Sequence, residues 1–264
     1  MKNYVTIPGP RMAGLFSYVM QVMQNLSAIE GTEHKLYIKF DKYMLYLDAR
    51  AGKNVWDYYF KQPFTFTAED ILNHGKEEVI FLENKKATRF PFIARPVSID
   101  VDRGRQICKK YIEVKPHILD KVNNFCSINF NGKKYFSIHR RGTDHYKDAP
   151  ILDLKDYFIA ADKKFNEYEY GLICSDELSS INAFKKRYGN KIKFYDSIRS
   201  DGPAGIHYSN GLQAPYKMGE DVLIESILMS KSDHIIKTVS AVSTFAVYFG
   251  QSTYDSIDLH IKYP

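Results

Sequence analysis

Charged side chains gather in one short segment, residues 137–145, with the sequence Ser-Ile-His-Arg-Arg-Gly-Thr-Asp-His. Arg140 and Arg141 carry planar, permanently charged groups that match phosphate oxygens. Gly142 allows a sharp turn or a close approach to a ligand, and Asp144 can orient an arginine or hold a hydroxyl. Taken alone, these residues could also form a solvated basic turn. Their place after an extended run favours a ligand site, because open α/β sheets bind ligands beyond the carboxyl ends of their strands.

Polar residues also follow the other predicted strands. Asp176 can bind a sugar or acceptor hydroxyl, or simply cap the next helix. His207 lies in a loop of more than 20 residues, a length that favours function, and could donate to a phosphate or to a reacting hydroxyl; an exposed structural histidine is the alternative. Ser240 and Ser243 flank the start of a predicted helix, where hydroxyls and free backbone N–H groups bind phosphate. A plain N-cap is the alternative for either serine.

Glu225 lies on a predicted helix beside the apolar residues Val222 and Met229. This spacing predicts a half-buried carboxylate. Such a group needs a partner, and the paired donors of a purine base or a ribose would serve.

The elements that position these residues alternate in the second half of the chain. Short apolar strands separated by amphipathic helices predict a parallel sheet with right-handed crossovers. The loops that follow the strands then collect the polar residues at one edge of the sheet. Predicted strands cover residues 135–138, 170–174, 191–195 and 234–238, and predicted helices cover 154–165, 178–188, 219–230 and 242–249.

The first half opens with a predicted strand at residues 4–7, a Pro-Gly-Pro break and an amphipathic helix at 13–29. This order is typical of nucleotide-binding folds, although the absence of a Gly-Lys-Ser/Thr sequence excludes a P-loop. Asp100 and Asp102 could hold a divalent cation. Because arginines follow them at once and would compete with a metal, we predict a surface turn that leads into a helix.

Composition narrows the class of protein. The chain has 264 residues, of which 44% are hydrophobic, so it can bury a sizeable core. Its net charge of +6 is spread along the sequence without a long basic run, which argues against nucleic-acid binding. Three distant cysteines, no apolar leader and no membrane-length apolar run predict a soluble cytoplasmic protein with reduced thiols.

Three motifs together resemble a known family. His139, Arg141 and Asp144 form a His-x-Arg-x-x-Asp pattern, followed by an acidic and apolar motif at residues 221–233 and a serine-bearing motif at 233–245. The chain is similar in these motifs to the fucosyltransferase superfamily that includes nodulation protein Z, the core α1,6-fucosyltransferases and the protein O-fucosyltransferases.

The resemblance implies an α/β, GT-B-like fold with two Rossmann-like lobes, which we place at residues 1–126 and 127–264. It implies that Arg141 holds the donor β-phosphate, that His139 and Glu225 contact the base, and that Ser240 or Ser243 meets the diphosphate. It also implies metal-independent transfer with inversion. No metal site and no cofactor are then expected beyond the donor substrate, GDP-fucose.

The chain departs from this family at several positions. Core-type members carry an arginine and a lysine where this sequence has Gly142 and His145. The position of their proposed base falls near Ala149, with Asp148 only a neighbour. Candidates for the catalytic base are therefore Asp144, His145, Asp148 and His207.

The predicted function is an inverting glycosyltransferase that moves a sugar, L-fucose from GDP-fucose, onto a hydroxyl of an oligosaccharide or glycoconjugate acceptor. Two alternatives stay open. The same fold could use another nucleotide sugar, such as a UDP- or GDP-linked pentose or deoxyhexose. It could also belong to a nucleotide-sugar-binding protein that has lost catalysis.

Overall fold

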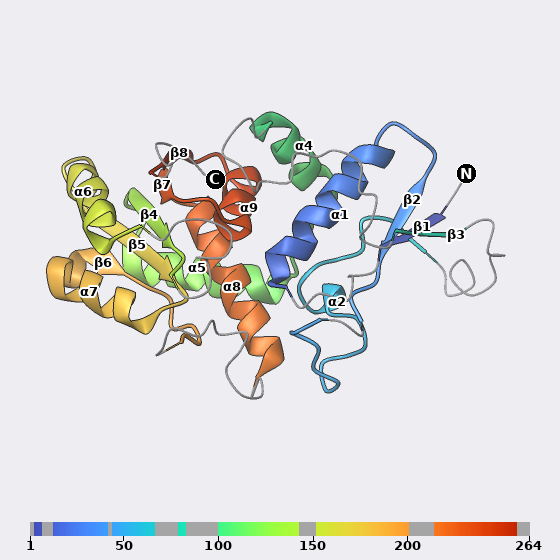
Figure 1. Ribbon diagram of the computed structural model, residues 1–264, viewed down its shortest axis with the longest axis horizontal. Coiled ribbons are helices and arrows are strands. Elements are labelled where there is room, and N and C mark those ends of the chain that lie inside the picture. The colour runs from blue at the N-terminus through green and yellow to red at the C-terminus, as the bar shows by residue number, and fades with distance from the viewer. Residues whose placement is uncertain are drawn as a thin grey trace.

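The computed structural model describes residues 3–6, 13–41, 44–66, 79–82, 100–142, 152–200 and 214–257. Within these ranges the chain forms two parallel β-sheets, one of three strands and one of five. The sheets lie towards opposite ends of an elongated molecule, with helices between them (Figure 1).

The N-terminal sheet has the strand order β2-β1-β3, with β1 at Asn3–Thr6, β2 at Lys35–Ile38 and β3 at Val79–Leu82. Helix α1 (Leu15–Ile29) connects the first two strands and buries an apolar stripe. The opening strand and helix predicted from the sequence are confirmed.

The C-terminal sheet has the order β6-β5-β4-β7-β8, and all its pairings are parallel. This order, in which the chain starts in the middle and runs outwards in both directions, defines a doubly wound sheet. The strands are β4 (Tyr135–Arg140), β5 (Tyr170–Ser175), β6 (Ile192–Lys193), β7 (His234–Lys237) and β8 (Thr253–Ser256).

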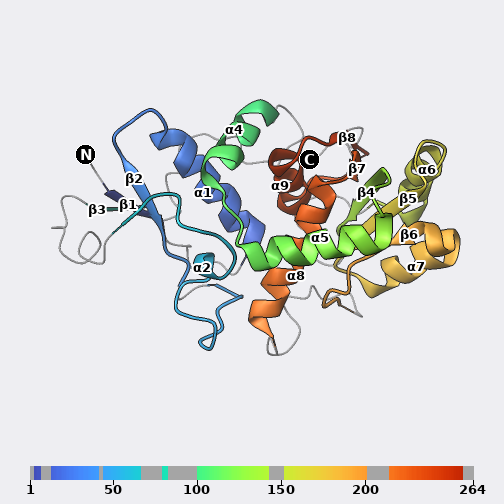
Figure 2. The ribbon, with the colours of Figure 1, turned by 180° about the vertical axis from the view of Figure 1, so that it is seen from behind.

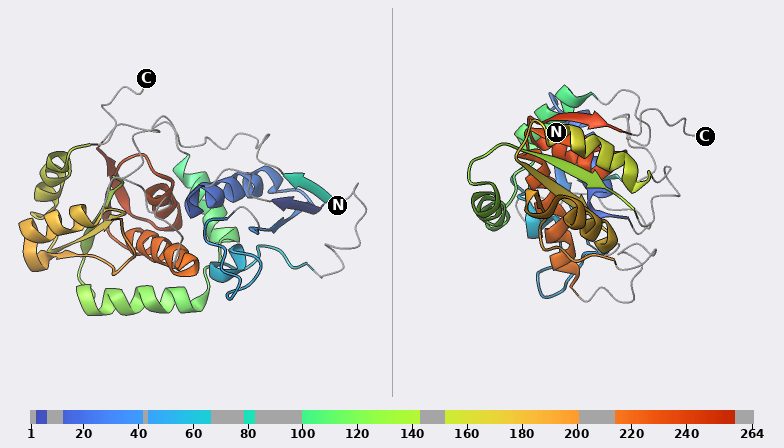
Figure 3. Two further views of the ribbon diagram at one scale, coloured as in Figure 1. Left: turned by 60° about the horizontal axis from the view of Figure 1, so that its bottom comes forward. Right: turned by 90° about the vertical axis from the view of Figure 1, so that its left-hand side faces the viewer.

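Helices cover both faces of this sheet because side chains alternate along each strand. Phe136 and Ile138 of β4 pack in one apolar cluster with α6 and α7, whereas Tyr135 packs on the opposite face, in the cluster of α8 and α9. Figure 3 shows α6 and α7 on the outer side and α8 and α9 on the side of the N-terminal half. The helices are α6 (Leu154–Lys164), α7 (Leu178–Tyr188), α8 (Pro215–Ser230) and α9 (Ala241–Phe249).

One apolar core joins the two halves. The rings of Phe16 on α1 and Phe245 on α9 lie 4.8 Å apart, within a cluster that continues into both sheets' helices. Two helices connect the halves in sequence, α4 (Val101–Tyr111) and α5 (Pro116–Phe130), and Figure 2 shows α5 running from the N-terminal half to the C-terminal sheet. The boundary predicted after residue 126 lies inside α5, which belongs to neither sheet. The limits of the two lobes therefore stay a prediction.

Several boundaries differ from those predicted. Strand β4 continues to Arg140 because its pairing with β5 extends to Arg140 and Ser175. Helix α4 starts at Val101, where the Asp100 side chain caps it by accepting a hydrogen bond of 3.0 Å from the Arg103 backbone N–H. The predicted turn that leads into a helix is therefore confirmed. The edge strand β8 was not predicted, because its polar sequence lacks an apolar run.

The remaining sequence-based expectations concern the core and the cysteines. Trp56, in the short helix α2 (Trp56–Tyr59), is fully buried and stacks on Phe60 at 4.5 Å, so this tryptophan belongs to the core. Cys108, Cys126 and Cys174 are free thiols. In the part of the chain that the structure describes, no helix is both long and apolar enough to cross a bilayer.

Candidate functional site

Two neighbouring strands separate at the carboxyl edge of the C-terminal sheet. The pairing of β4 with β7 ends at Ile138 and Ile236, while β4 stays paired with β5 two residues further. From here β4 leads to Arg141 and then to α6 on one face, and β7 leads to Ser240 and then to α9 on the other face. This is the topological switch point, where doubly wound sheets bind their ligands.

The two arginines of the segment have different surroundings. Arg140 is the last residue of β4 and is 8% exposed, with hydrogen bonds to Ser180 Oγ (2.5 Å) and an ion pair with Glu177. Its guanidinium, which by its chemistry matches phosphate oxygens, is instead turned to the face of α7 and neutralised there. Arg141, half-buried, follows immediately and is the arginine at the switch point.

Gly142 is packed against the start of α7. Its backbone N–H donates to Asp176 Oδ1 at 3.1 Å, and a Cβ placed on it would overlap the carboxyl group of Glu177. Glu177 cannot move away freely because Arg140 and Ser180 hold the same carboxylate. A larger residue than glycine is therefore disfavoured at this position for a steric reason. The backbone at Arg141 is held on both sides, by the contacts of Arg140 and of Gly142.

Replacing Gly142 with alanine is expected to lower the free energy of unfolding by about 1–3 kcal/mol, the usual cost of overpacking. Denaturant titration measures this cost. In a Glu177→Ala background the same replacement should cost much less, because the overlapping carboxyl group is gone. An equal cost in both backgrounds would contradict the steric explanation.

Asp176 connects two loops by hydrogen bonds. One of its oxygens receives the Gly142 N–H, and its backbone oxygen accepts from the Ser200 N–H at 2.9 Å. The corner after β5 thus connects the loops that follow β4 and β6. Its predicted contact with a ligand hydroxyl stays a prediction.

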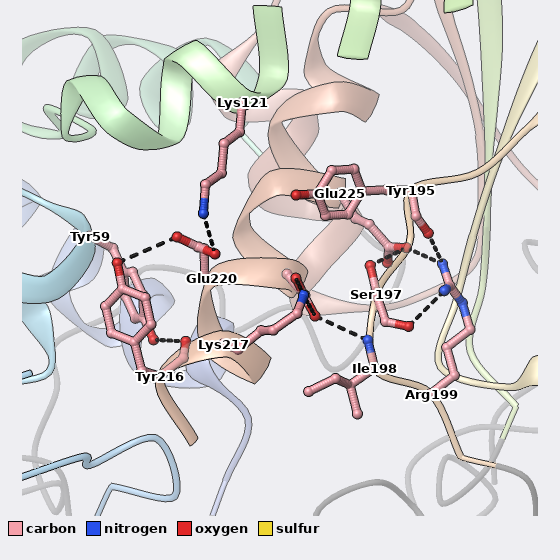
Figure 4. A network of polar contacts seen from close by, with 11 residues as sticks. Tyr59, Lys121, Tyr195, Ser197, Ile198, Arg199, Tyr216, Lys217, Glu220 and Glu225 are labelled. Atoms are coloured by element: carbon pink, nitrogen blue, oxygen red, sulfur yellow. Dashed lines mark hydrogen bonds and ion pairs between the residues drawn. The ribbon is translucent and has the colours of Figure 1, made fainter. Parts of the chain in front are cut away.

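Glu225 projects from α8 towards the segment that follows β6 (Figure 4). Its Oε1 accepts from Ser197 Oγ at 2.9 Å and from Arg199 Nη2 at 2.6 Å. The predicted buried carboxylate with a polar partner is confirmed, but this partner is an arginine of the chain. The sequence reasoning missed Arg199, although its position shortly after a strand end was the available signal.

Burial raises the pKa of Glu225 to about 7. The positive charge of Arg199 and the Ser197 hydroxyl oppose this shift, while the nearby carboxylates of Asp221 and Asp176 add to it. The charge of Glu225 therefore depends on its arginine partner near neutral pH.

The start of α9 presents two buried serines. Ser240 occupies the N-cap position, yet its side chain makes no capping hydrogen bond, so the plain N-cap alternative does not describe it. The Ser243 hydroxyl turns back to the backbone oxygens of Thr238 and Ser240, each at 3.3 Å. Free N–H groups at this helix start can meet an anion at the switch point.

Four predicted catalytic residues, Asp144, His145, Asp148 and His207, lie outside the described residues. His139 lies inside β4 and is buried. The roles assigned to all five stay predictions.

The alternative metal ligands, Asp100 and Asp102, lie at the start of α4. Among the residues with described positions, no group of three or more His, Cys, Asp or Glu side chains could hold a metal ion.

A doubly wound parallel sheet that shares its core with a second parallel sheet defines the α/β, GT-B-like class predicted from the sequence. No family model and no curated protein sequence matches the chain. Among solved structures, the chain is similar to NodZ α-1,6-fucosyltransferase soaked with GDP-fucose, with a TM-score of 0.62 at 13% identity over 95% of this chain and 93% of that one.

Two other fucosyltransferases have the same fold. Arabidopsis thaliana FUT1, in complex with GDP, matches with a TM-score of 0.60 at 11% identity over 96% of this chain and 70% of that one. POFUT1 in complex with GDP matches with a TM-score of 0.54 at 11% identity over 97% and 98% of the two chains. The fold class is therefore confirmed as that of this fucosyltransferase group.

Proposed function

We propose that the protein is an inverting, metal-independent glycosyltransferase that uses GDP-fucose as donor and a carbohydrate hydroxyl as acceptor. One observation carries this proposal: Arg141 follows the central strand of a doubly wound sheet at its switch point, opposite the start of α9. The donor is suggested by the fold neighbours, which were crystallised with GDP or GDP-fucose. The acceptor class, an oligosaccharide or glycoconjugate, comes from the family resemblance.

In this reaction the acceptor oxygen bonds to the anomeric carbon while the bond from that carbon to the β-phosphate oxygen breaks. Negative charge builds on the leaving diphosphate. Arg141 and the N–H groups at the start of α9 would stabilise that charge, which is commonly the largest single contribution to such catalysis. The proton of the acceptor hydroxyl would pass to Asp144, His145, Asp148 or His207.

Donor binding is assigned to the surrounding residues. His139 and Glu225 would contact the base, and Ser240 or Ser243 the diphosphate. Asp176 would hold a sugar hydroxyl with the carboxylate that also fixes Gly142.

A nucleotide-sugar-binding protein without catalysis is the second candidate, and the different residues at Gly142 and His145 favour it. Prolonged incubation with GDP-fucose separates the two. An enzyme releases GDP slowly even without an acceptor, whereas a binding protein leaves the donor intact.

A thermal-shift panel of GDP, GDP-fucose, GMP, UDP and a UDP-sugar tests the donor class. A ligand present at a hundred times its Kd stabilises the folded state by about 2.7 kcal/mol. For a chain of this size, that corresponds to a rise in Tm of about 5–10 °C. GDP and GDP-fucose should give this rise, with less for GMP because it lacks the β-phosphate. Equal or larger shifts with UDP compounds would replace the proposed donor with a uridine nucleotide.

A further inference from the structure

Two carboxylates on α8, Asp221 and Glu225, lie one turn apart and hold the segment that follows β6. Asp221 Oδ2 accepts from the Ile198 backbone N–H at 3.0 Å, and Lys217 Nζ lies 2.7 and 2.9 Å from the two Asp221 oxygens. Together with the Glu225 contacts, this fixes the segment residue by residue against the helix.

The guanidinium of Arg199 is the centre of this arrangement. Its side chain is 5% exposed, and its three nitrogens donate to the backbone oxygens of Ser175 (3.1 Å), Ser197 (2.9 Å) and Tyr195 (2.7 Å) as well as to Glu225. So many bonds to one planar group leave it a single orientation. Arg199 therefore presents a fixed positive charge to Glu225.

The Glu225 carboxylate uses only one of its two oxygens in this contact. Both of its hydrogen bonds within the described residues go to Oε1. A carboxylate oxygen has two lone pairs, so Oε2 keeps the capacity to accept from a ligand. With Oε1 held by Arg199, the direction of Oε2 is set before any ligand arrives.

We infer that Arg199 is a positioning residue for the donor base: it keeps Glu225 ionised and turned so that Oε2 accepts N–H donors from the base. This inference rests on the proposed function. Guanine presents two adjacent donors, N1–H and N2–H, to such an acceptor. Uracil presents one N–H that lies between two carbonyl oxygens. A carboxylate repels these two oxygens. The Arg199–Glu225 pair therefore selects a guanine nucleotide over a uridine nucleotide.

The charges around Glu225 give this role a pH signature. Asp221 on its own helix and Asp176 at the end of β5 raise its pKa, and Arg199 lowers it. Cys174 and Tyr195 also face it, but burial raises the pKa of both groups, so they stay neutral. Removing the Arg199 charge must raise the pKa of Glu225 further. As the solution is acidified, Glu225 is then protonated at a higher pH than in the parent protein, and it loses its ability to accept the N–H donors of the base.

Titration calorimetry with GDP and UDP from about pH 6 to about pH 9 tests this. In the parent protein GDP affinity should fall as the pH drops through about 7, the pKa of Glu225. Arg199→Gln should move this midpoint up by about one pH unit or more, which means roughly tenfold weaker GDP binding just above neutrality. UDP binding should change little in the same variant.

Two further variants separate a positioning role from a structural one. Glu225→Gln should remove this part of the pH dependence, and its profile gives the background from the ligand phosphates. Arg199→Lys keeps the charge but loses the planar fork, so it should keep a midpoint near that of the parent while binding GDP more weakly. If Arg199→Gln fails to fold, the inference is decided by the loss of pH dependence in Glu225→Gln and by the weaker GDP binding of Arg199→Lys.

The inference is overturned if Arg199→Gln leaves the pH profile of GDP binding unchanged, if Glu225→Gln keeps the pH dependence of the parent, or if Arg199→Lys binds GDP as tightly as the parent. Its failure differs from a failure of the proposed function. If the parent protein binds neither GDP nor UDP, the donor assignment itself is wrong. If it binds GDP in a way that Arg141→Ala abolishes, yet the pH profiles of Arg199→Gln and Glu225→Gln do not change, only the role of the Arg199–Glu225 pair is wrong.

Discussion

Arg141→Ala is expected to reduce turnover with GDP-fucose by at least about a hundredfold, as for the loss of a main charge-stabilising donor. The neighbouring Arg140 cannot take over, because it is buried and paired with Glu177. The effect should fall mainly on kcat, since the charge on the diphosphate is largest in the transition state. GDP release, followed with and without acceptor, measures it.

A matched control is Arg187→Ala on α7, whose guanidinium is half-exposed and paired with Asp162 on α6. Surface pairs of this kind contribute little to stability, and this one lies on the outer helices, so turnover should stay near that of the parent. Addition of EDTA should also leave turnover intact. Near-normal activity of Arg141→Ala would remove this residue from the mechanism, and a strong loss in EDTA would show that a metal ion takes part.

Phe245→Ala is expected to lower the free energy of unfolding by about 3–5 kcal/mol, the range for an aromatic ring removed from a packed core. Phe245 has no exposed surface, and its ring lies 4.8 Å from Phe16 and 5.3 Å from Phe249. Because Phe16 belongs to α1 of the N-terminal half, the lost contacts link the two halves of the chain. Urea titration followed by far-UV circular dichroism measures the change.

The same titration tests whether the two halves unfold together. Trp56 is the only tryptophan and reports on the N-terminal half by its fluorescence. If the core is shared, fluorescence and circular dichroism should give one coincident transition that Phe245→Ala shifts as a whole. Ile128→Ala, at a side chain 73% exposed on α5, should change stability by no more than about 0.5 kcal/mol. Two separate transitions, with only the circular dichroism shifted, would contradict a common core.

Local patterns in the sequence were sufficient for much of the fold. Apart from β8, the alternation of strands and helices from residue 135 onwards was predicted with errors of a few residues, and α7 (Leu178–Tyr188) with none. Helical and strand periodicities are carried by neighbouring residues, so one sequence contains them. The same patterns placed Arg141 and Ser240 near the carboxyl edge of one sheet, because the ends of parallel strands meet there.

The partners of these residues were decided only by the tertiary structure. The sequence does not distinguish the roles of Arg140 and Arg141. In the structure, β4 stays paired with β5 through Arg140, whose side chain contacts Glu177, and Arg141 is the arginine that follows at the switch point. Likewise, a buried Glu225 required some partner, and the fold supplied Arg199 from a segment 26 residues away. Composition and periodicity determine which elements form and which faces are buried. Contacts between distant segments depend on strand order and register, which no local pattern contains.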